Sequence, residues 1–207
     1  MNDSEKHSII QFNKWAQTYD KNFISYYHFY YLNKQVTKLL NPQRGSSVLD
    51  IGFGTGLLLD QLLRSDKDLR LYGLDISEEM YKKAEAKFSG NPRVNLTLGS
   101  ANKLPYADGA FDYVTCVHSL HHHADTQQSL KEMYRVLKPG GKVVVIDPSI
   151  DGFLRKIFLK LSVFVHNEKG TRHYTKSQMK ALFEKAGFKN IRQDHSWDLA
   201  LINLGEK

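Results

Sequence analysis

The chain has 207 residues, of which 41% are hydrophobic and 25% charged, a composition typical of one globular domain with a substantial core. Its single cysteine, Cys116, excludes an internal disulfide framework and a cysteine-based metal cluster. No stretch reaches the roughly 20 apolar residues of a membrane span, and the polar N-terminus lacks the apolar core of a signal peptide, so we expect a cytoplasmic protein.

Two helices are predicted before the first strand. Apolar residues at helical spacing cover residues 8–18, and an aromatic-rich stretch runs over residues 23–40. One interpretation is that the aromatic rings cover an edge of the sheet. The other is that they form a lid that closes over a ligand and excludes water. The sequence favours neither.

The chain is organised around one stretch, a strand followed by three glycines and a helix. Residues 47–51 form an apolar run typical of a buried strand in a parallel sheet. Gly52, Gly54 and Gly56 follow, and residues 57–63 carry a helical apolar face. This order brings backbone N–H groups and a helix N-terminus to one point, where glycine lets a ligand lie against the backbone. It predicts a nucleotide-like ligand at the carboxyl end of the strand.

Two carboxylates narrow the choice of ligand. Asp50, beside the glycines, would repel a pyrophosphate but suits a cationic group. Asp75 ends the next apolar run, where a carboxylate can bind the two hydroxyls of a ribose. A ribose, a cationic group and no phosphate fit S-adenosylmethionine, which carries a sulfonium. An NAD-type Rossmann loop is the alternative.

The segment 50–56, which reads Asp-x-Gly-x-Gly-x-Gly, resembles motif I of the class I S-adenosylmethionine-dependent methyltransferases. The resemblance covers residues 12–207, and residues 15–20 are similar to the entry segment of the small-molecule and quinone branch. It implies a Rossmann-like α/β three-layer sandwich. The seven-stranded, mostly parallel sheet would have the order 3-2-1-4-5-7-6 with an antiparallel last strand. It also implies that Tyr19 reaches toward the methionine part of the cofactor.

The switch point of such a sheet lies beside its first strand, at the carboxyl end. We therefore expect the residues that bind S-adenosylmethionine to surround one crevice there. These residues are Tyr19, Asp50, Gly52, Gly54, Gly56, Asp75, Ile76, Ser100, Ala101 and Val117.

The segment after the third predicted strand, residues 94–98, departs from the family pattern. Relatives usually carry Gly-Asp-Ala-Glu-x-Leu-Pro-Phe there, and the resemblance implies that the acid meets the adenine amino group. In this chain Ser100 replaces the acid and Asn102 replaces the glutamate. A charge-assisted hydrogen bond is thereby lost, so we expect either weaker cofactor binding or compensation by another group.

The fourth predicted strand, residues 110–117, leads into a segment with four histidines. The resemblance implies that the position just past this strand faces the transferable methyl group, so His118 is the candidate catalytic residue. We expect His121, His122 and His123 to bind backbone carbonyls and to orient the next helix. No metal site is expected, because neither a cysteine nor a second cluster supports the histidines.

The remaining elements continue the same fold. A helix capped by Asp125 is predicted to end at a turn over residues 137–141, before a strand over residues 143–147. An apolar helix with a basic face is predicted over residues 151–166 and a further helix over residues 175–187. Two strands, residues 188–195 and 199–204, are joined by a hairpin turn.

We expect one methyltransferase domain over residues 1–207. Within it, residues 1–44 form the N-terminal helical lid, residues 45–147 the cofactor-binding half and residues 148–207 the half on the substrate side.

The predicted activity is methyl transfer from S-adenosylmethionine to oxygen, nitrogen or carbon of a small, hydrophobic or aromatic acceptor. The sequence after the fourth strand lacks the (Asn/Asp)-Pro-Pro-(Tyr/Phe) motif of nucleic-acid amino methyltransferases, so no nucleic-acid partner is expected. The sequence allows a monomer or homodimer and weak peripheral contact of the basic helix with a membrane. Two alternatives stay open: an S-adenosylmethionine-binding protein without catalysis, and a nicotinamide-dependent oxidoreductase.

Overall fold

The computed structural model describes residues 9–10, 12–13, 23–65, 67–149, 151–152, 171–196 and 200–207 of the chain. Three predictions fall mostly outside these ranges: the cofactor contact of Tyr19, the basic helix over residues 151–166 and the hairpin turn over residues 196–198. These stay predictions, and so does the membrane contact expected for the basic helix.

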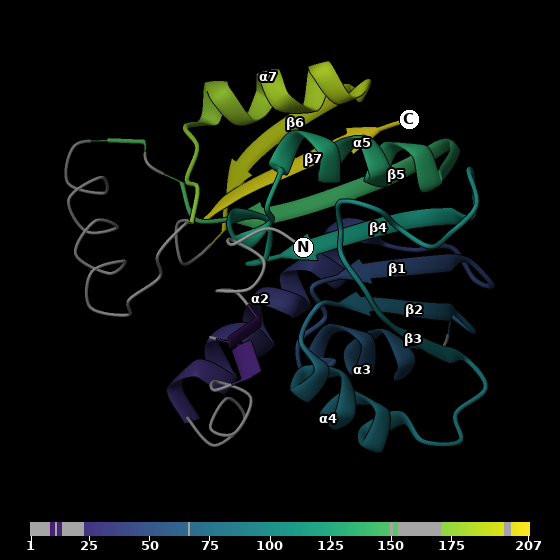
Figure 1. Cartoon of the computed structure of the whole chain (residues 1–207). Helices are drawn as coiled ribbons and strands as arrows, with labels where there is room; N and C mark the ends of the chain where they lie inside the picture. The colour runs from purple at the N-terminus through teal and green to yellow at the C-terminus, as the bar shows by residue number, and fades with distance from the viewer. Residues whose placement is uncertain are drawn as a thin grey trace.

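A seven-stranded sheet forms the centre of the molecule, in the predicted order β3-β2-β1-β4-β5-β7-β6 (Figure 1). Strands β1 to β5 pair in parallel, and β7 pairs antiparallel with both β5 and β6. The strands are β1 (Ser47–Ile51), β2 (Arg70–Asp75), β3 (Val94–Leu98), β4 (Phe111–Val117), β5 (Leu137–Asp147), β6 (Lys189–His195) and β7 (Leu201–Glu206). Every residue of β1 is buried, as expected for a central parallel strand covered on both faces.

Helices cover both faces of the sheet and make two hydrophobic cores. One core is formed with α2 (Phe23–Leu40), α3 (Leu57–Leu63) and α4 (Glu78–Phe88), and the other with α5 (Thr126–Val136) and α7 (Lys176–Ala186) (Figure 1). The predicted three-layer α/β sandwich is therefore confirmed. No helix within the described ranges is both long enough and apolar enough to cross a membrane.

The second half of α2 belongs to one of these cores. Leu32 and Val36 are fully buried and Leu40 is 5% exposed, and all three pack in the core that α3 also lines. The side-chain amide of Gln61 in α3 donates a hydrogen bond to the carbonyl of Tyr30. This half of α2 thus packs in the core through aliphatic side chains, whereas the rings of Tyr27 and Tyr31 are exposed.

Polar side chains start the helices on both faces, among them the predicted cap Asp125. The hydroxyl of Ser77 accepts a hydrogen bond from Met80 N–H at the start of α4, and the carboxylate of Asp125 accepts one from Gln128 N–H at the start of α5. Thr175 begins α7 with a complete capping box. These caps fix where each helix leaves the sheet edge that carries the site.

The fifth strand is longer than the sequence suggested. We predicted a turn over residues 137–141 and a strand from residue 143, but β5 already begins at Leu137, which pairs with Phe111. The register then shifts, so that Lys142 pairs with Tyr113. The Pro-Gly-Gly segment is therefore an irregularity within a paired strand, with Gly140 at a φ of 76°.

Candidate functional site

The three glycines after β1 are required for different physical reasons, although all three have positive φ: 74° at Gly52, 56° at Gly54 and 77° at Gly56. A Cβ on Gly52 would collide with the hydroxyl of Ser119, whereas a Cβ on Gly54 would meet nothing within 4 Å. A Cβ on Gly56 would lie 2.5 Å from the ring of Phe88 in α4. Gly54 is thus the glycine whose backbone is open to a ligand, and Gly56 is the one that lets α3 begin against α4.

The carboxylate of Asp75 at the end of β2 holds this glycine turn. Its Oδ2 accepts a hydrogen bond from Gly54 N–H at 2.8 Å, and its Oδ1 accepts one from Ser77 N–H at 2.9 Å. Burial raises the pKa of Asp75, while these N–H groups oppose the rise. Because each carboxylate oxygen can accept two hydrogen bonds, Asp75 keeps acceptor capacity toward the cavity that it lines.

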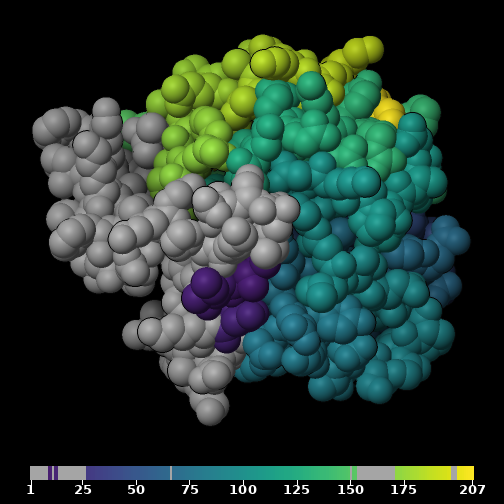
Figure 2. All heavy atoms as spheres, viewed as in Figure 1, coloured from purple at the N-terminus to yellow at the C-terminus, as the bar shows by residue number. Residues whose placement is uncertain are grey.

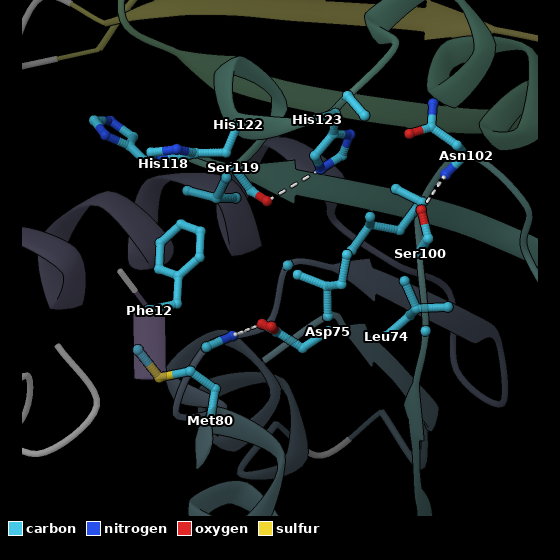
Figure 3. A pocket seen from close by; sticks show the side chains of 18 residues that line it. Phe12, Leu74, Asp75, Met80, Ser100, Asn102, His118, Ser119, His122 and His123 are labelled. Carbon is cyan, nitrogen blue, oxygen red and sulfur yellow. Dashed lines mark hydrogen bonds between the residues drawn. The ribbon is translucent and has the colours of Figure 1, made fainter. Parts of the chain in front are cut away.

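A cavity of about 80 Å³ lies at the carboxyl ends of β1, β2, β3 and β4 (Figure 3). It brings together eight of the predicted cofactor or catalytic residues, which come from four separate parts of the sequence. They are Gly52, Gly54, Asp75, Ile76, Ser100, Ala101, Val117 and His118. Figure 3 shows Asp75 and Leu74 on one side of this cavity and Ser119 and His123 on the other.

The predicted residue Asp50 lies in a neighbouring cavity of about 50 Å³, which shares Gly52, Gly54 and Val117 with the first. Its side chain is buried and accepts a hydrogen bond from the hydroxyl of Thr115 at 2.8 Å. Burial raises the pKa of Asp50 to about 7, and the negative charge of Asp75 adds to this effect. A cationic group in this cavity would stabilise the carboxylate form.

Ser100 and Asn102 form the end of the cavity where we predicted adenine recognition. The hydroxyl of Ser100 accepts a hydrogen bond from Asn102 N–H at 3.3 Å. The side-chain amide of Asn102 donates to the carbonyl of Asp125 at 2.7 Å and to the hydroxyl of Ser129 at 3.2 Å. Asn102 therefore ties the loop after β3 to the start of α5, a role different from that of the glutamate it replaces.

We call residues 118–125 the histidine segment. It begins with His118 in the left-handed region, at a φ of 49°, where a hydrogen bond from its N–H to the carbonyl of Ile146 holds it against β5. The imidazole of His118 lies edge-on to the rings of His28 and Phe29 in α2, at centroid distances of 5.7 and 5.6 Å. The candidate catalytic residue thus lies where the cavity meets α2.

The prediction that the other histidines bind backbone carbonyls is wrong for His121 and His123, since their ring nitrogens meet side chains. His121 Nδ1 lies 2.8 Å from Asp147 Oδ1, and His123 Nε2 lies 3.2 Å from the hydroxyl of Ser119. Residues 120–122 form the short 3₁₀ helix η2 (Leu120–His122), which turns these rings inward rather than toward the helix that follows. The signal that sequence reasoning missed is the acid at the end of β5, Asp147.

Burial keeps these histidines neutral. It lowers the pKa of His121 and of His122 well below the ordinary value, and lowers the pKa of His123 to about 3. No group of histidine, cysteine and acidic side chains suited to hold a metal ion occurs among the described residues. His122 and His123, which line the cavity, are therefore uncharged near neutral pH.

Two residues that were not among the predicted site residues also line the cavity. Phe12 lies edge-on to His122 with ring centroids 4.7 Å apart, and Met80 extends from the first turn of α4 (Figure 3). Asn13 accepts a hydrogen bond from the hydroxyl of Ser77 at 2.7 Å. Residues 12–13 thus lie over the cavity mouth, and the helical spacing of apolar residues over 8–18, to which Phe12 belongs, was the signal available for them.

Comparisons with known proteins decide the family. A family model described as a methyltransferase domain matches residues 49–145. A demethylmenaquinone methyltransferase of Staphylococcus carnosus is 32% identical over 233 residues, which cover 100% of this chain and 95% of the relative. One of Anoxybacillus flavithermus is 32% identical, with 95% and 93% covered. The chain belongs to the class I S-adenosylmethionine-dependent methyltransferases, in the quinone-type branch. The prediction of this enzyme class and of its cofactor is confirmed, and the oxidoreductase alternative falls.

Solved structures of other methyltransferases have the same fold. An S-adenosylmethionine-dependent methyltransferase of Thermotoga maritima superimposes with a TM-score of 0.77 at 24% identity, covering 95% of this chain and 98% of that chain. Phosphoethanolamine N-methyltransferase 2 of Haemonchus contortus, solved with S-adenosylmethionine, gives 0.75 at 26% identity, covering 88% of this chain and 43% of that chain.

Proposed function

We propose that this methyltransferase acts on a small, hydrophobic acceptor of the quinol type, bound between the histidine segment and α2. The observation that supports this best is the 32% identity to demethylmenaquinone methyltransferases along the whole chain. The lining of the site agrees, because His118 is flanked by Phe29 and His28, and His122 by Phe12. Flat apolar walls with few polar atoms suit an aromatic ring.

The cavity has the groups that S-adenosylmethionine needs. In this proposal Asp75 binds the ribose hydroxyls, the open backbone at Gly54 lies against the nucleoside, and Ser100 and Ala101 meet the adenine. Asp50 faces the methionine end from the adjoining cavity, where a cation would lower its raised pKa. When bound, this cofactor supplies an electrophilic methyl group on a sulfonium. Ile76 and Val117 contribute apolar wall, and Tyr19 is assigned to the same site by the resemblance alone.

His118 is the residue we assign to proton removal from the acceptor. It directly follows Val117, lines the cavity and contacts α2, so an acceptor held against α2 would meet its imidazole. Attack by a quinol carbon requires the ring hydroxyl to lose its proton, and an imidazole can accept a proton near neutral pH. The protein otherwise contributes alignment and exclusion of water.

We further propose that residues before β1 combine two roles. Leu32 and Val36 support the sheet, while Phe12 and Asn13 close the cavity against His122 and Ser77. The division into lid, cofactor half and substrate-side half follows this arrangement.

Mass spectrometry of a turnover assay tests the acceptor class. The purified protein is incubated with S-adenosylmethionine and a short-chain demethylmenaquinone kept reduced, and we expect a product in which one methyl group replaces one hydrogen. S-adenosylhomocysteine should form in equal amount, and the oxidised quinone should not react. Methylation of a simple phenol or amine in preference to the quinol would contradict the acceptor class. Binding of the cofactor without turnover on any of them would support the non-catalytic alternative.

A further inference from the structure

A histidine and a carboxylate form a buried pair beside the cavity, outside the groups assigned so far. His121 Nδ1 lies 2.8 Å from Asp147 Oδ1, and their side chains are 7% and 2% exposed. Asp147 is the last residue of β5, held on one side by the pairing with β7, where Leu201 lies opposite it. A buried carboxylate is costly unless a donor stabilises it, so the pair is a feature that the fold maintains at a cost.

The surroundings of this pair are rich in imidazole. The ring of His121 stacks on that of His173 at 5.3 Å and lies 4.0 Å from that of His122. The ionisable groups that act on the pair come from β4, the histidine segment and the segment after residue 170. They are Cys116, His118, His122, His123 and His173.

Among these groups, His118 acts electrostatically on both members of the pair. A positive charge on His118 disfavours protonation of His121 and favours the charged form of Asp147. Burial raises the pKa of Asp147 to about 7 although His118, His173 and backbone N–H groups oppose the rise, so the charge of Asp147 depends on the groups beside it.

We propose that Asp147 and His121 are a positioning pair for the methyl transfer, and that their negative charge stabilises the proton which His118 takes from the acceptor. Asp147 accepts a hydrogen bond from His121 Nδ1–H, which fixes the tautomer and the orientation of that ring. The contact between the tilted rings of His121 and His122 then positions His122 on the cavity wall. This inference rests on the proposed function, because it assumes an acceptor that must lose a proton.

The reaction then balances without an oxidant or reductant. The quinol O–H bond breaks and its proton moves to His118, the ring carbon forms a bond to the methyl group, and the carbon–sulfur bond breaks with its electron pair on sulfur. The carbon that gains the methyl group loses its own hydrogen as a proton, which restores the aromatic ring and the hydroxyl. The net change is one methyl group for one hydrogen, with one proton released to solvent.

Asp147→Asn is the decisive variant, because it keeps the size of the side chain and one acceptor oxygen but removes the charge. We expect kcat with the reduced short-chain demethylmenaquinone to fall about 100-fold, with the affinity for S-adenosylmethionine within about twofold of wild type. Asp147→Glu should restore part of the rate. Wild-type kcat at saturating cofactor should rise with pH through about 7, as Asp147 ionises, and the part of this rise that is due to Asp147 should be absent in Asp147→Asn.

Asp112→Asn is the matched control. Asp112 is also a hydrogen-bonded carboxylate, bound to Ser47 and Lys138, but at the other end of the sheet. Its replacement should lower Tm without changing kcat or the pH profile. If Asp147→Asn behaves like this control, with wild-type kcat and pH dependence, the proposal is overturned.

NMR titration of the histidine rings in the cofactor-free protein gives a readout that needs no turnover. His118 should protonate at a lower pH in Asp147→Asn than in wild type, while Asp112→Asn should leave it unchanged. Equal titration of His118 in all three proteins would refute the pair's role. If the quinol is not methylated but His118 responds as expected, the acceptor class is wrong and the pair stands.

Discussion

The two walls of the cavity are built in different ways. On the cofactor wall, the carboxylate of Asp75 binds the N–H groups of Gly54 and Ser77, so its shape depends on backbone next to two strand ends. On the opposite wall, His121 and His123 bind the side chains of Asp147 and Ser119. The first wall is a pattern of local turns, and the second is a set of tertiary contacts between side chains. This difference decides which parts of the site can be changed without moving the others.

The same difference explains why the sequence predicts the cofactor wall better than the histidine wall. A strand, three glycines and a helix follow one another within 17 residues, 47–63. This one segment is therefore enough to predict the turn and the side of it on which a ligand binds. The contact of His121 with Asp147 joins positions 26 residues apart, and the packing of Ser119 over Gly52 depends on β1 and β4 being neighbours. No local sequence pattern indicates either of these two contacts. The histidines were therefore predicted to bind backbone carbonyls.

The predicted boundary of a strand was wrong where strand pairing overrides the local preference of the sequence. Pro-Gly-Gly reads as a turn, yet hydrogen bonding to β4 and β7 draws the whole stretch into β5. The aromatic helix before β1 was ambiguous for a related reason. Its burial depends on α3, which no periodicity in residues 23–40 could show.

Removing the Asp75 carboxylate should have the largest effect on the cofactor wall. Asp75→Ala should weaken binding of S-adenosylmethionine by about 2–4 kcal/mol, because charge-assisted hydrogen bonds to the ribose are lost. The N–H of Gly54 also loses its acceptor, so the turn should loosen. Calorimetry measures the affinity, with Glu78→Ala in the first turn of α4 as an exposed acidic control. Wild-type affinity in Asp75→Ala would show that the ribose assignment is wrong.

Asp50, in the cavity beside the cofactor wall, and His123, on the opposite wall, should respond oppositely to pH. Each should change the free energy of unfolding by about 1–3 kcal/mol. The pKa of Asp50 is raised from 3.8 to about 7, so its contribution to stability is present below pH 3.8 and is lost as pH rises through 7. The pKa of His123 is lowered from 6.5 to about 3, so its contribution is present above pH 6.5 and is lost as pH falls.

Urea unfolding without cofactor should separate the two effects. Asp50→Asn should exceed wild type in stability at pH 8 and lose this advantage at pH 4, whereas His123→Leu should exceed wild type at pH 4 more than at pH 8. Asp194→Asn, on the exposed face of β6, should follow wild type at both pH values. Parallel pH curves for wild type and both cavity variants would contradict the opposite behaviour of the two walls.

The smallest expected effect concerns the end of the cavity where both walls meet. Ser100→Asp restores the acid that the family pattern has there, and we expect it to raise the affinity for S-adenosylmethionine by about 1 kcal/mol, because a carboxylate accepts a stronger hydrogen bond from the adenine amino group than a hydroxyl does. Asn102 N–H, now 3.3 Å from the Ser100 hydroxyl, can donate to the new carboxylate, so the loop need not move.

An analogue of the cofactor that lacks the adenine amino group makes this test specific. Ser100→Asp should bind this analogue no better than wild type does, because the added carboxylate then has no donor to meet. Ser89→Asp, which adds the same charge at the exposed end of α4, should change neither affinity. If Ser100→Asp gains equally for both ligands, the gain comes from net charge rather than from adenine recognition. If it gains for neither, another group already meets the amino group, and His123, across the cavity from Asp75 in Figure 3, is the next residue to replace.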